Sequence, residues 1–400
     1  MKDVKTFLLL ILFILLVSVL RAHSKGDTTK SSLSDKIKLR GYVKNMQTFQ
    51  MADVNYVAHD NLIHNRLNFR FYPSKSFSSG LEIRNRVFSG DLVNFNPDYA
   101  KSVSTENGLV DLSWAWLDTP GLVGLSQIDR AWFNWNNDSW DVTLGRQRIN
   151  WGVNAFWNSN DLFNTFDLVD FDYEERPGTD AIRVQRFFKD FSSVDIAIAP
   201  SKYDSAWIGA GMYKFNKGTY DFQVLTGWWN QDIALGAGWA GNLKSASFKG
   251  EVTYFHPQSE WQGLKGDITA SISFDYMFKG NKYAMVGLMY GSNGIGKSLD
   301  INALSNSSFA SAALPSAKNL MPTKYNALVS VSLPITSLIS AALVGIYSPG
   351  VNLLFAMPSL SMSISSSWDF SIFGQTTFLD DSTRFKNYGT SVFARLKWGF

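Results

Sequence analysis

Two groups of charged residues carry the chemistry in this sequence. Acidic residues crowd the stretch from 161 to 175, which contains no basic residue: Asp161, Asp167, Asp170, Asp172, Glu174 and Glu175. Arginines stand opposite the aliphatic residues of alternating segments elsewhere: Arg66, Arg70, Arg84, Arg86 and Arg183. Carboxylates that face arginines across a water-filled passage would set a transverse field, which sorts solutes by charge. We therefore expect both groups to line a pore.

The acidic stretch has two other interpretations. It could be an ordinary solvated loop, or it could bind calcium, because Asp170, Asp172 and Glu174 are oxygen ligands of the kind that calcium prefers. The glycine of an EF-hand loop is missing, however. The stretch belongs to a connection of 29 residues, 150–178, which we expect to fold into or over the lumen.

Arg146 and Arg148 are further candidates for the pore lining. They follow Val142 and Leu144 at every second position, so an unbroken strand would place them on the same apolar face. They reach the lumen only if the strand bulges, and Gly145 is a suitable position for a bulge.

Catalysis has little support in the residue types. The chain has no cysteine and only four histidines, and no Gly-x-Ser-x-Gly sequence marks a nucleophile. His256, which precedes Pro257, is the one histidine that merits a test, and we expect it to be a strand-end or lumen residue. The sequence therefore predicts no enzyme, cofactor or metal site.

The elements that must position these charges are alternating strands. At the chain end, Leu396, Trp398 and Phe400 would share one face, with Arg395 and Lys397 on the other, as a membrane-barrel wall requires. Similar segments recur along the chain, joined mostly by short turns: 37–50, 61–72, 79–88, 110–118, 124–136, 139–149, 179–189, 191–200, 206–216, 218–229, 231–241, 245–256, 265–279, 281–291, 323–334, 336–348, 352–365, 367–380 and 387–400.

This set contains an odd number of strands, whereas bacterial single-chain barrels normally have an even number. One assignment must be wrong, and we expect a transmembrane antiparallel all-β barrel of 16 or 18 strands. Counting turns back from the chain end puts 150–178 outside the cell, while counting forward from residue 37 puts it on the periplasmic side. We favour the backward count, which also makes 291–323 an outer loop.

The start of the chain predicts export. Lys2 and Lys5 precede an apolar run from Phe7 to Leu20, and the small residues Ala22 and Ser24 follow it, as in a signal peptide. We divide the chain into a signal peptide (1–22), a short polar lead (23–36) and one barrel domain (37–400). Removing the first 22 residues lowers the net charge from +3 to +1, which leaves no electrostatic footprint for nucleic acid.

Two motifs resemble known families. The final strand, with Leu396, Trp398 and Phe400, resembles that of outer-membrane barrels, whose terminal Phe is read by the barrel-assembly machinery. The run from Trp140 to Gly152 contains Gly-Arg-Gln and Trp-Gly, and it is followed by 156–164 and by Glu-Arg-Pro-Gly at 175–178. This arrangement resembles Gram-negative porins of the alginate-export-like and phosphate-selective-like group. In place of an expected Pro before Asp161, this chain has Asn158-Ser159-Asn160.

These observations predict a channel in the outer membrane of a Gram-negative cell, through which small polar or charged solutes diffuse passively. The alternative is a closed barrel that binds, exports or assembles a surface polysaccharide or lipid. The expected partners are outer-membrane lipid and lipopolysaccharide, the secretion and barrel-assembly machinery, the solutes, and in one interpretation further copies of the chain.

Overall fold

The computed structural model describes residues 36–53, 56–104, 108–164, 178–202, 206–258, 265–297, 316–380 and 384–400. The predicted signal peptide and most of the polar lead fall outside these residues, as do Asp167, Asp170, Asp172, Glu174 and Glu175. No helix in the described part of the chain is long and apolar enough to cross a membrane.

Alternation produces strands at all nineteen predicted places. Their bounds are β1 (Ile37–Asp53), β2 (Tyr56–Phe71), β3 (Phe77–Gly90), β4 (Ser113–Thr119), β5 (Leu122–Asn136), β6 (Trp140–Gln147), β7 (Thr179–Phe187), β8 (Ser193–Ala199), β9 (Ile208–Lys217), β10 (Tyr220–Trp229), β11 (Asp232–Leu243), β12 (Ala246–Pro257), β13 (Asp267–Phe278), β14 (Lys282–Gly291), β15 (Tyr325–Pro334), β16 (Ile339–Ser348), β17 (Leu353–Ser363), β18 (Trp368–Asp380) and β19 (Phe385–Gly399). Two short helices, α3 (Asp91–Phe95) and α4 (Tyr99–Val103), lie between β3 and β4.

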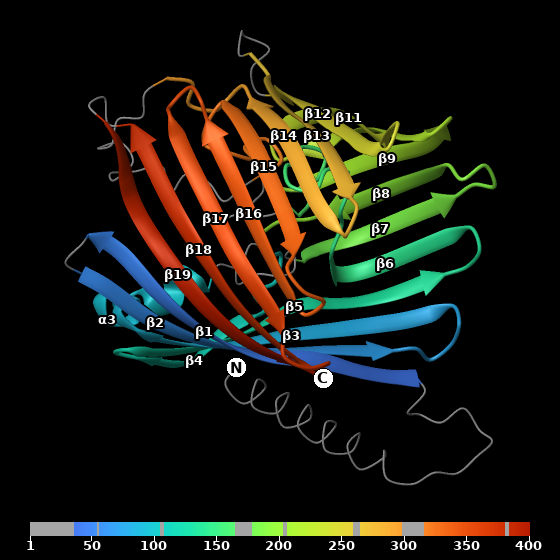
Figure 1. Ribbon diagram of the computed structural model, residues 1–400. Helices are drawn as coiled ribbons and strands as arrows, with labels where there is room; N and C mark the ends of the chain where they lie inside the picture. Colours follow the sequence, from blue (N-terminus) through green and yellow to red (C-terminus); the bar gives the residue numbers. More distant parts are fainter. Residues whose placement is uncertain are drawn as a thin grey trace.

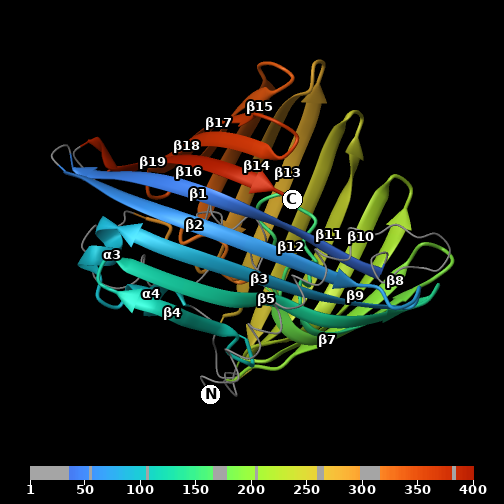
Figure 2. The ribbon, with the colours of Figure 1, turned by 90° about the horizontal axis from the view of Figure 1, so that it is seen from below.

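The wall is a closed antiparallel barrel of 18 strands, which confirms one of the two expected numbers. β3 pairs with β5 rather than with β4, and β19 pairs with β1 to complete the circuit. Figure 1 shows the wall from the side, and Figure 2 shows β1, β2, β3 and β5 next to one another. Including β4 in the circuit was therefore the error in the sequence-based count.

β4 is hydrogen-bonded to β5 along the same edge as β6, opposite the edge that pairs with β3. β6 pairs with β5 from Ala131 to Asn136, whereas β4 pairs with it from Leu122 to Gln127. When β4 is left out of the circuit, counting turns forward from residue 37 and counting them back from the chain end place the connection between β6 and β7 at the same end of the barrel. The connection between β6 and β7 then lies at the barrel end opposite the start of β1 and the end of β19, as the backward count predicted.

The two faces of the wall differ as the alternation predicts. Outward residues such as Val286, Leu288 and Val329 are half exposed, whereas their inward neighbours Met285, Met289 and Leu328 are buried. The inward residues are buried because connections from the end opposite the termini pack against them. An 18-stranded wall is wide enough to enclose an aqueous passage beside such connections.

Three connections contribute to the packing inside the barrel. Val93 of α3 and Ala100 of α4 pack with Met46, Leu62 and Phe88. The connection between β6 and β7 contributes two further clusters, in which Trp151 packs on Phe163 and Trp157 packs near Met285. Figure 1 shows part of this connection in green inside the barrel.

Part of the stretch expected to be an outer loop also returns to the inner wall. Leu320 joins the cluster of Trp157, and the backbone oxygen of Lys318 accepts a hydrogen bond of 2.8 Å from Thr269 of β13. The connection therefore joins β14 and β15 at the end opposite the termini, where an outer loop was expected, and its segment around Lys318 and Leu320 folds back against the inner wall.

The last residue closes the wall. Phe400 and Gly41 exchange two backbone hydrogen bonds, of 2.9 and 3.0 Å. A side chain at Gly41 would meet the Phe400 ring at 2.8 Å and the Arg66 backbone oxygen at 2.4 Å, so only glycine lets the strands approach here.

We expect deletion of Phe400 to lower the fraction of protein that shows heat-modifiable mobility in outer-membrane fractions. The deletion removes both hydrogen bonds to Gly41 and a ring that packs on Trp398 at 5.0 Å. The matched control is Phe385→Ala, at the other end of the same strand, where the ring is half exposed. Equal folded fractions for the two variants would show that closure does not depend on Phe400.

Candidate pore and its inserted connection

The connection between β6 and β7 is attached to the wall by a buried carboxylate. Glu251 of β12 accepts three backbone N–H hydrogen bonds: Oε1 from Val153 at 2.5 Å and Asn154 at 2.7 Å, and Oε2 from Asn160 at 2.9 Å. Its side chain is 1% exposed. A carboxylate has about four lone-pair sites, so one residue can hold two parts of the connection together.

Neighbouring strands continue this attachment with neutral hydrogen bonds. Gln223 of β10 donates to the Trp151 oxygen at 2.6 Å, and Ser271 of β13 donates to the Trp157 oxygen at 2.8 Å. Trp229 of β10 donates to the Leu162 oxygen at 2.9 Å. The segment from 149 to 164 therefore lies against the inner faces of several consecutive strands rather than across open solvent.

Small residues make room for the connection. A side chain at Gly236 or Gly238 of β11 would meet Asn160 at 2.8 Å, so a wall with larger residues here would displace it. Within the connection, a Cβ on Gly152 would lie 2.2 Å from Asn158 Oδ1. This contact accounts for the glycine of the Trp-Gly motif.

The predicted arginines of β2 and β3 form an ion-pair network on the inner wall. Arg66 contacts Glu82 at 2.5 Å and also pairs with Asp129, and all three side chains are 2% exposed. Arg70 pairs with Glu82 as well, and Arg84 lies 3.4 Å from Asp129. The network therefore combines more guanidinium groups than carboxylates.

A β-bulge lets two successive residues of β5 join this network. The pairing of β3 with β5 skips one residue, so Glu82 faces Arg130 while Ile83 faces Ile128. Asp129 is the extra residue, and both Asp129 and Arg130 then contact the network. Strict alternation does not predict this bulge, because it assigns consecutive residues to opposite faces.

The other predicted arginines have separate partners. Arg86 donates to the Val103 oxygen of α4 at 3.1 Å, and Arg183 pairs with Asp195 at 2.5 Å. Arg146 pairs with Asp180 at 2.8 Å and donates to the Val110 oxygen at 2.6 Å. These contacts do not bring the predicted residues into one cluster.

Arg146 does not reach its position through a bulge. The register runs unbroken through Gly145, which instead has a φ of +110°. Arg146 lies near the end of β6, where the strand that pairs with β5 changes from β6 to β4. Its contacts with Asp180 of β7 and with the backbone of Val110, just before β4, connect these two parts of the wall. Arg148 is exposed. The role of both residues as pore lining stays a prediction.

Asp161 is the one predicted acidic residue within the described part of the chain. Its side chain is completely buried, and its carboxylate accepts the Trp151 N–H at 3.3 Å. It thus holds two parts of the inserted connection together, as Asn164 does by accepting the Ile149 N–H at 2.7 Å.

Two further observations concern the ionisation of one buried side chain and the possible metal ligands. Burial of Tyr99 in α4, with the nearby Asp60 carboxylate adding to the effect, raises the pKa of Tyr99 to about 12, so this phenol stays neutral at ordinary pH. Among the described residues, no group of three acidic or histidine side chains could hold a metal ion.

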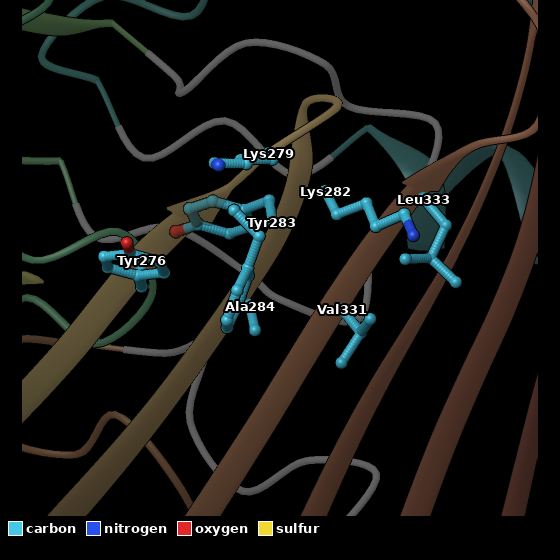
Figure 3. A pocket seen from close by; sticks show the side chains of 8 residues that line it. Tyr276, Lys279, Lys282, Tyr283, Ala284, Val331 and Leu333 are labelled. Carbon is cyan, nitrogen blue, oxygen red and sulfur yellow. The ribbon is translucent and has the colours of Figure 1, made fainter.

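Figure 3 shows a groove of about 450 Å³ outside this region, at the turn end of β13, β14 and β15. Tyr276, Ala284, Val331 and Leu333 line it, together with Lys282. Tyr276, Ala284, Val331 and Leu333 lie on the outward face of the wall, so the groove is not part of the inner wall.

Glu251 is the main residue that the sequence analysis did not identify. It is the one acidic residue in β12, and it alternates with Thr253 and Phe255. The signal that could have identified it is the facing run of small residues at Ala234, Gly236 and Gly238, which predicts that something packs against the inner wall there.

No protein-family model matches the sequence, and no curated protein matches it. Solved structures share its fold. OccAB4 of Acinetobacter baumannii has a TM-score of 0.56 at 8% identity, over 91% of this chain and 98% of that one. OccK8 (OprE) of Pseudomonas aeruginosa has a TM-score of 0.55 at 9% identity, covering 92% and 98%.

A BenF-like porin from Pseudomonas fluorescens Pf-5 is similar at a TM-score of 0.56 and 9% identity, over 92% of this chain and all of that one. The protein therefore has the fold of Gram-negative porins, a closed 18-stranded antiparallel barrel. At this identity the similarity concerns the fold alone.

Proposed function

We propose that this protein is an outer-membrane channel for passive diffusion of small polar or charged solutes. The observation that carries the proposal is the asymmetric inner wall: an arginine-rich network on β2, β3 and β5, and an inserted connection anchored by Glu251 on the other strands. The porin fold supports it, since the named neighbours include a BenF-like porin. The narrower alginate-export-like or phosphate-selective-like grouping rests on the Gly-Arg-Gln and Trp-Gly motif.

The proposed selectivity follows from the charges on the passage. A fixed unit charge about 10 Å from a passing ion changes the electrostatic energy of that ion by roughly 1.7 kcal/mol at an effective dielectric constant of about 20. This energy is enough to change the local ion concentration more than tenfold. The arginines would raise the concentration of anions, and the carboxylates between 161 and 175 would raise that of cations. Whether the channel prefers anions or cations depends on which of these two sets of charges lines its narrowest section.

The test is recording in planar bilayers. We expect discrete conductance steps, whereas insertion without conduction would favour the rival barrel that handles a surface polysaccharide or lipid. Replacing Arg66, Arg70 and Arg84 with Gln should shift the reversal potential in a salt gradient towards cations, because Glu82 and Asp129 lose their counter-charges.

Replacing Asp167, Asp170 and Asp172 with Asn should shift the reversal potential towards anions. Both shifts should shrink in 1 M salt, where the Debye length is about 3 Å instead of about 10 Å at 0.1 M. Lys101→Gln, outside the strands, is the control and should have no such effect. If neither triple variant moves the reversal potential, these residues do not line the conducting path.

A further inference from the structure

The groove at the turn end of β13, β14 and β15 faces outward and is built around one small residue (Figure 3). Tyr276 of β13 pairs with Ala284 of β14, and Ala284 pairs with Val331 of β15. Their side chains share the outward face of the wall with Val286, which is half exposed. The methyl group of Ala284 therefore forms a floor between two larger side chains.

The end of this groove at the hairpin between β13 and β14 is cationic. Lys279 and Lys282 flank the two turn residues Gly280 and Asn281, and both lysine side chains line the groove. Both are exposed. Figure 3 shows the two lysines nearer to the hairpin than Ala284. The groove thus combines an apolar floor with two positive charges at one end.

No carboxylate of the surrounding chain compensates these two charges. The segments 276–284 and 331–340, which form the groove and its edges, contain no Asp or Glu. Neither lysine makes an ion pair within the described part of the chain, whereas Lys249 of the neighbouring β12 lies 3.4 Å from Asp275. The two ammonium groups can therefore bind an anion from outside the chain.

The surface around the lysines is apolar. Four large apolar side chains at this end of β13, β15 and β16 are between 44% and 60% exposed: Phe278, Leu333, Ile335 and Leu338. A small hydrophilic anion would leave this surface uncovered, whereas acyl chains would bury it. A negatively charged headgroup that carries acyl chains is complementary to both the lysines and the groove.

We propose that this groove binds an anionic diacyl phospholipid. Its phosphate contacts Lys279 and Lys282, and one acyl chain lies over Ala284. The proposal rests on the proposed function only in that the barrel spans the outer membrane. On the orientation predicted by the backward count, this end faces the periplasm, where the adjoining leaflet contains phospholipid rather than lipopolysaccharide. A second copy of the chain is less complementary, because a two-fold contact here would bring the lysines of both copies together.

Native mass spectrometry of the purified protein, freed of bound lipid, tests the headgroup. The protein is offered equal amounts of dioleoyl phosphatidylglycerol and dioleoyl phosphatidylcholine, which share their acyl chains and differ in net charge. Each lysine near a membrane surface favours anionic lipid by roughly fivefold, so we expect the wild-type protein to retain at least about fivefold more phosphatidylglycerol. Replacing Lys279 and Lys282 with Gln should bring retention of the two lipids within about twofold of each other.

The matched control removes two exposed lysines from other turns at the same end of the barrel. Lys217→Gln at the end of β9, combined with Lys244→Gln just after β11, should leave the preference unchanged, because neither residue lines the groove. An equal loss in this control, or a wild-type protein without a preference, would overturn the proposal. A protein that keeps the preference but does not conduct in planar bilayers supports this site and contradicts only the channel proposal.

A second pair of variants tests the groove itself. Ala284→Phe fills the floor of the groove and should lower the retention of both lipids by about fivefold or more. Ala237→Phe makes the same change at an outward position of β11, between Val224 and Val252, and should retain both lipids as the wild-type protein does. Heat-modifiable mobility checks that both variants fold. Wild-type retention by Ala284→Phe, or a dimer of chains that this variant dissociates without any change in bound lipid, would show that the groove does not hold an acyl chain.

Discussion

Replacement of Glu251 with Ala is expected to release the inserted connection and to destabilise the barrel by several kcal/mol. The change removes the acceptor of three buried N–H groups, on Val153, Asn154 and Asn160. Hydrogen bonds to a charged group contribute about 1.5–3 kcal/mol each, and a buried donor left without a partner costs about 1–3 kcal/mol. Single-channel currents should change from one steady level to several fluctuating levels.

The control for this prediction is Thr253→Val on the same face of β12. Thr253 lies 2.8 Å from the Ser159 oxygen, so its replacement removes a neutral hydrogen bond and leaves the carboxylate in place. We expect a loss of about 1 kcal/mol and a steady current. A Glu251→Ala channel with wild-type stability and a single conductance level would show that the carboxylate does not hold the connection.

Replacement of Asp129 with Ala is expected to cost about 3–5 kcal/mol in the free energy of unfolding, because it leaves buried Arg66 with only one of its two carboxylate partners. The measurement is urea-induced unfolding in lipid vesicles. Exchanging Arg66 and Asp129 together for Met and Leu should cost less than the single change, because the Arg66 charge leaves together with its partner and Glu82 keeps Arg70; only Arg84 loses a nearby carboxylate.

The chain offers a matched control in the pair of Asp98 and Lys101. This pair lies at 2.7 Å between side chains that are 72% and 85% exposed, outside the strands. Asp98→Asn should change stability by less than about 1 kcal/mol. If the exposed and buried pairs have equal effects, burial does not set the energetics of the arginine network.

Much of the wall could be predicted because its signal is local. A strand in a barrel has one apolar and one wet face, so alternation of residues such as Leu396 and Trp398 with Arg395 and Lys397 identifies it without knowledge of its neighbours. All nineteen predicted strands are present. The preference of bacterial barrels for an even number of strands also indicates that one of the nineteen lies outside the circuit, although it does not say which one.

Tertiary structure decided which strands are neighbours and what the inner face binds. β4 alternates like a wall strand, and only its pairing with the same edge of β5 as β6 excludes it from the circuit. Glu251 acts on residues about a hundred positions earlier in the chain, and Asp129 reaches Arg66 through a bulge. Alternation assigns each residue to a face, but the contacts across the lumen depend on chain closure, which no local pattern contains.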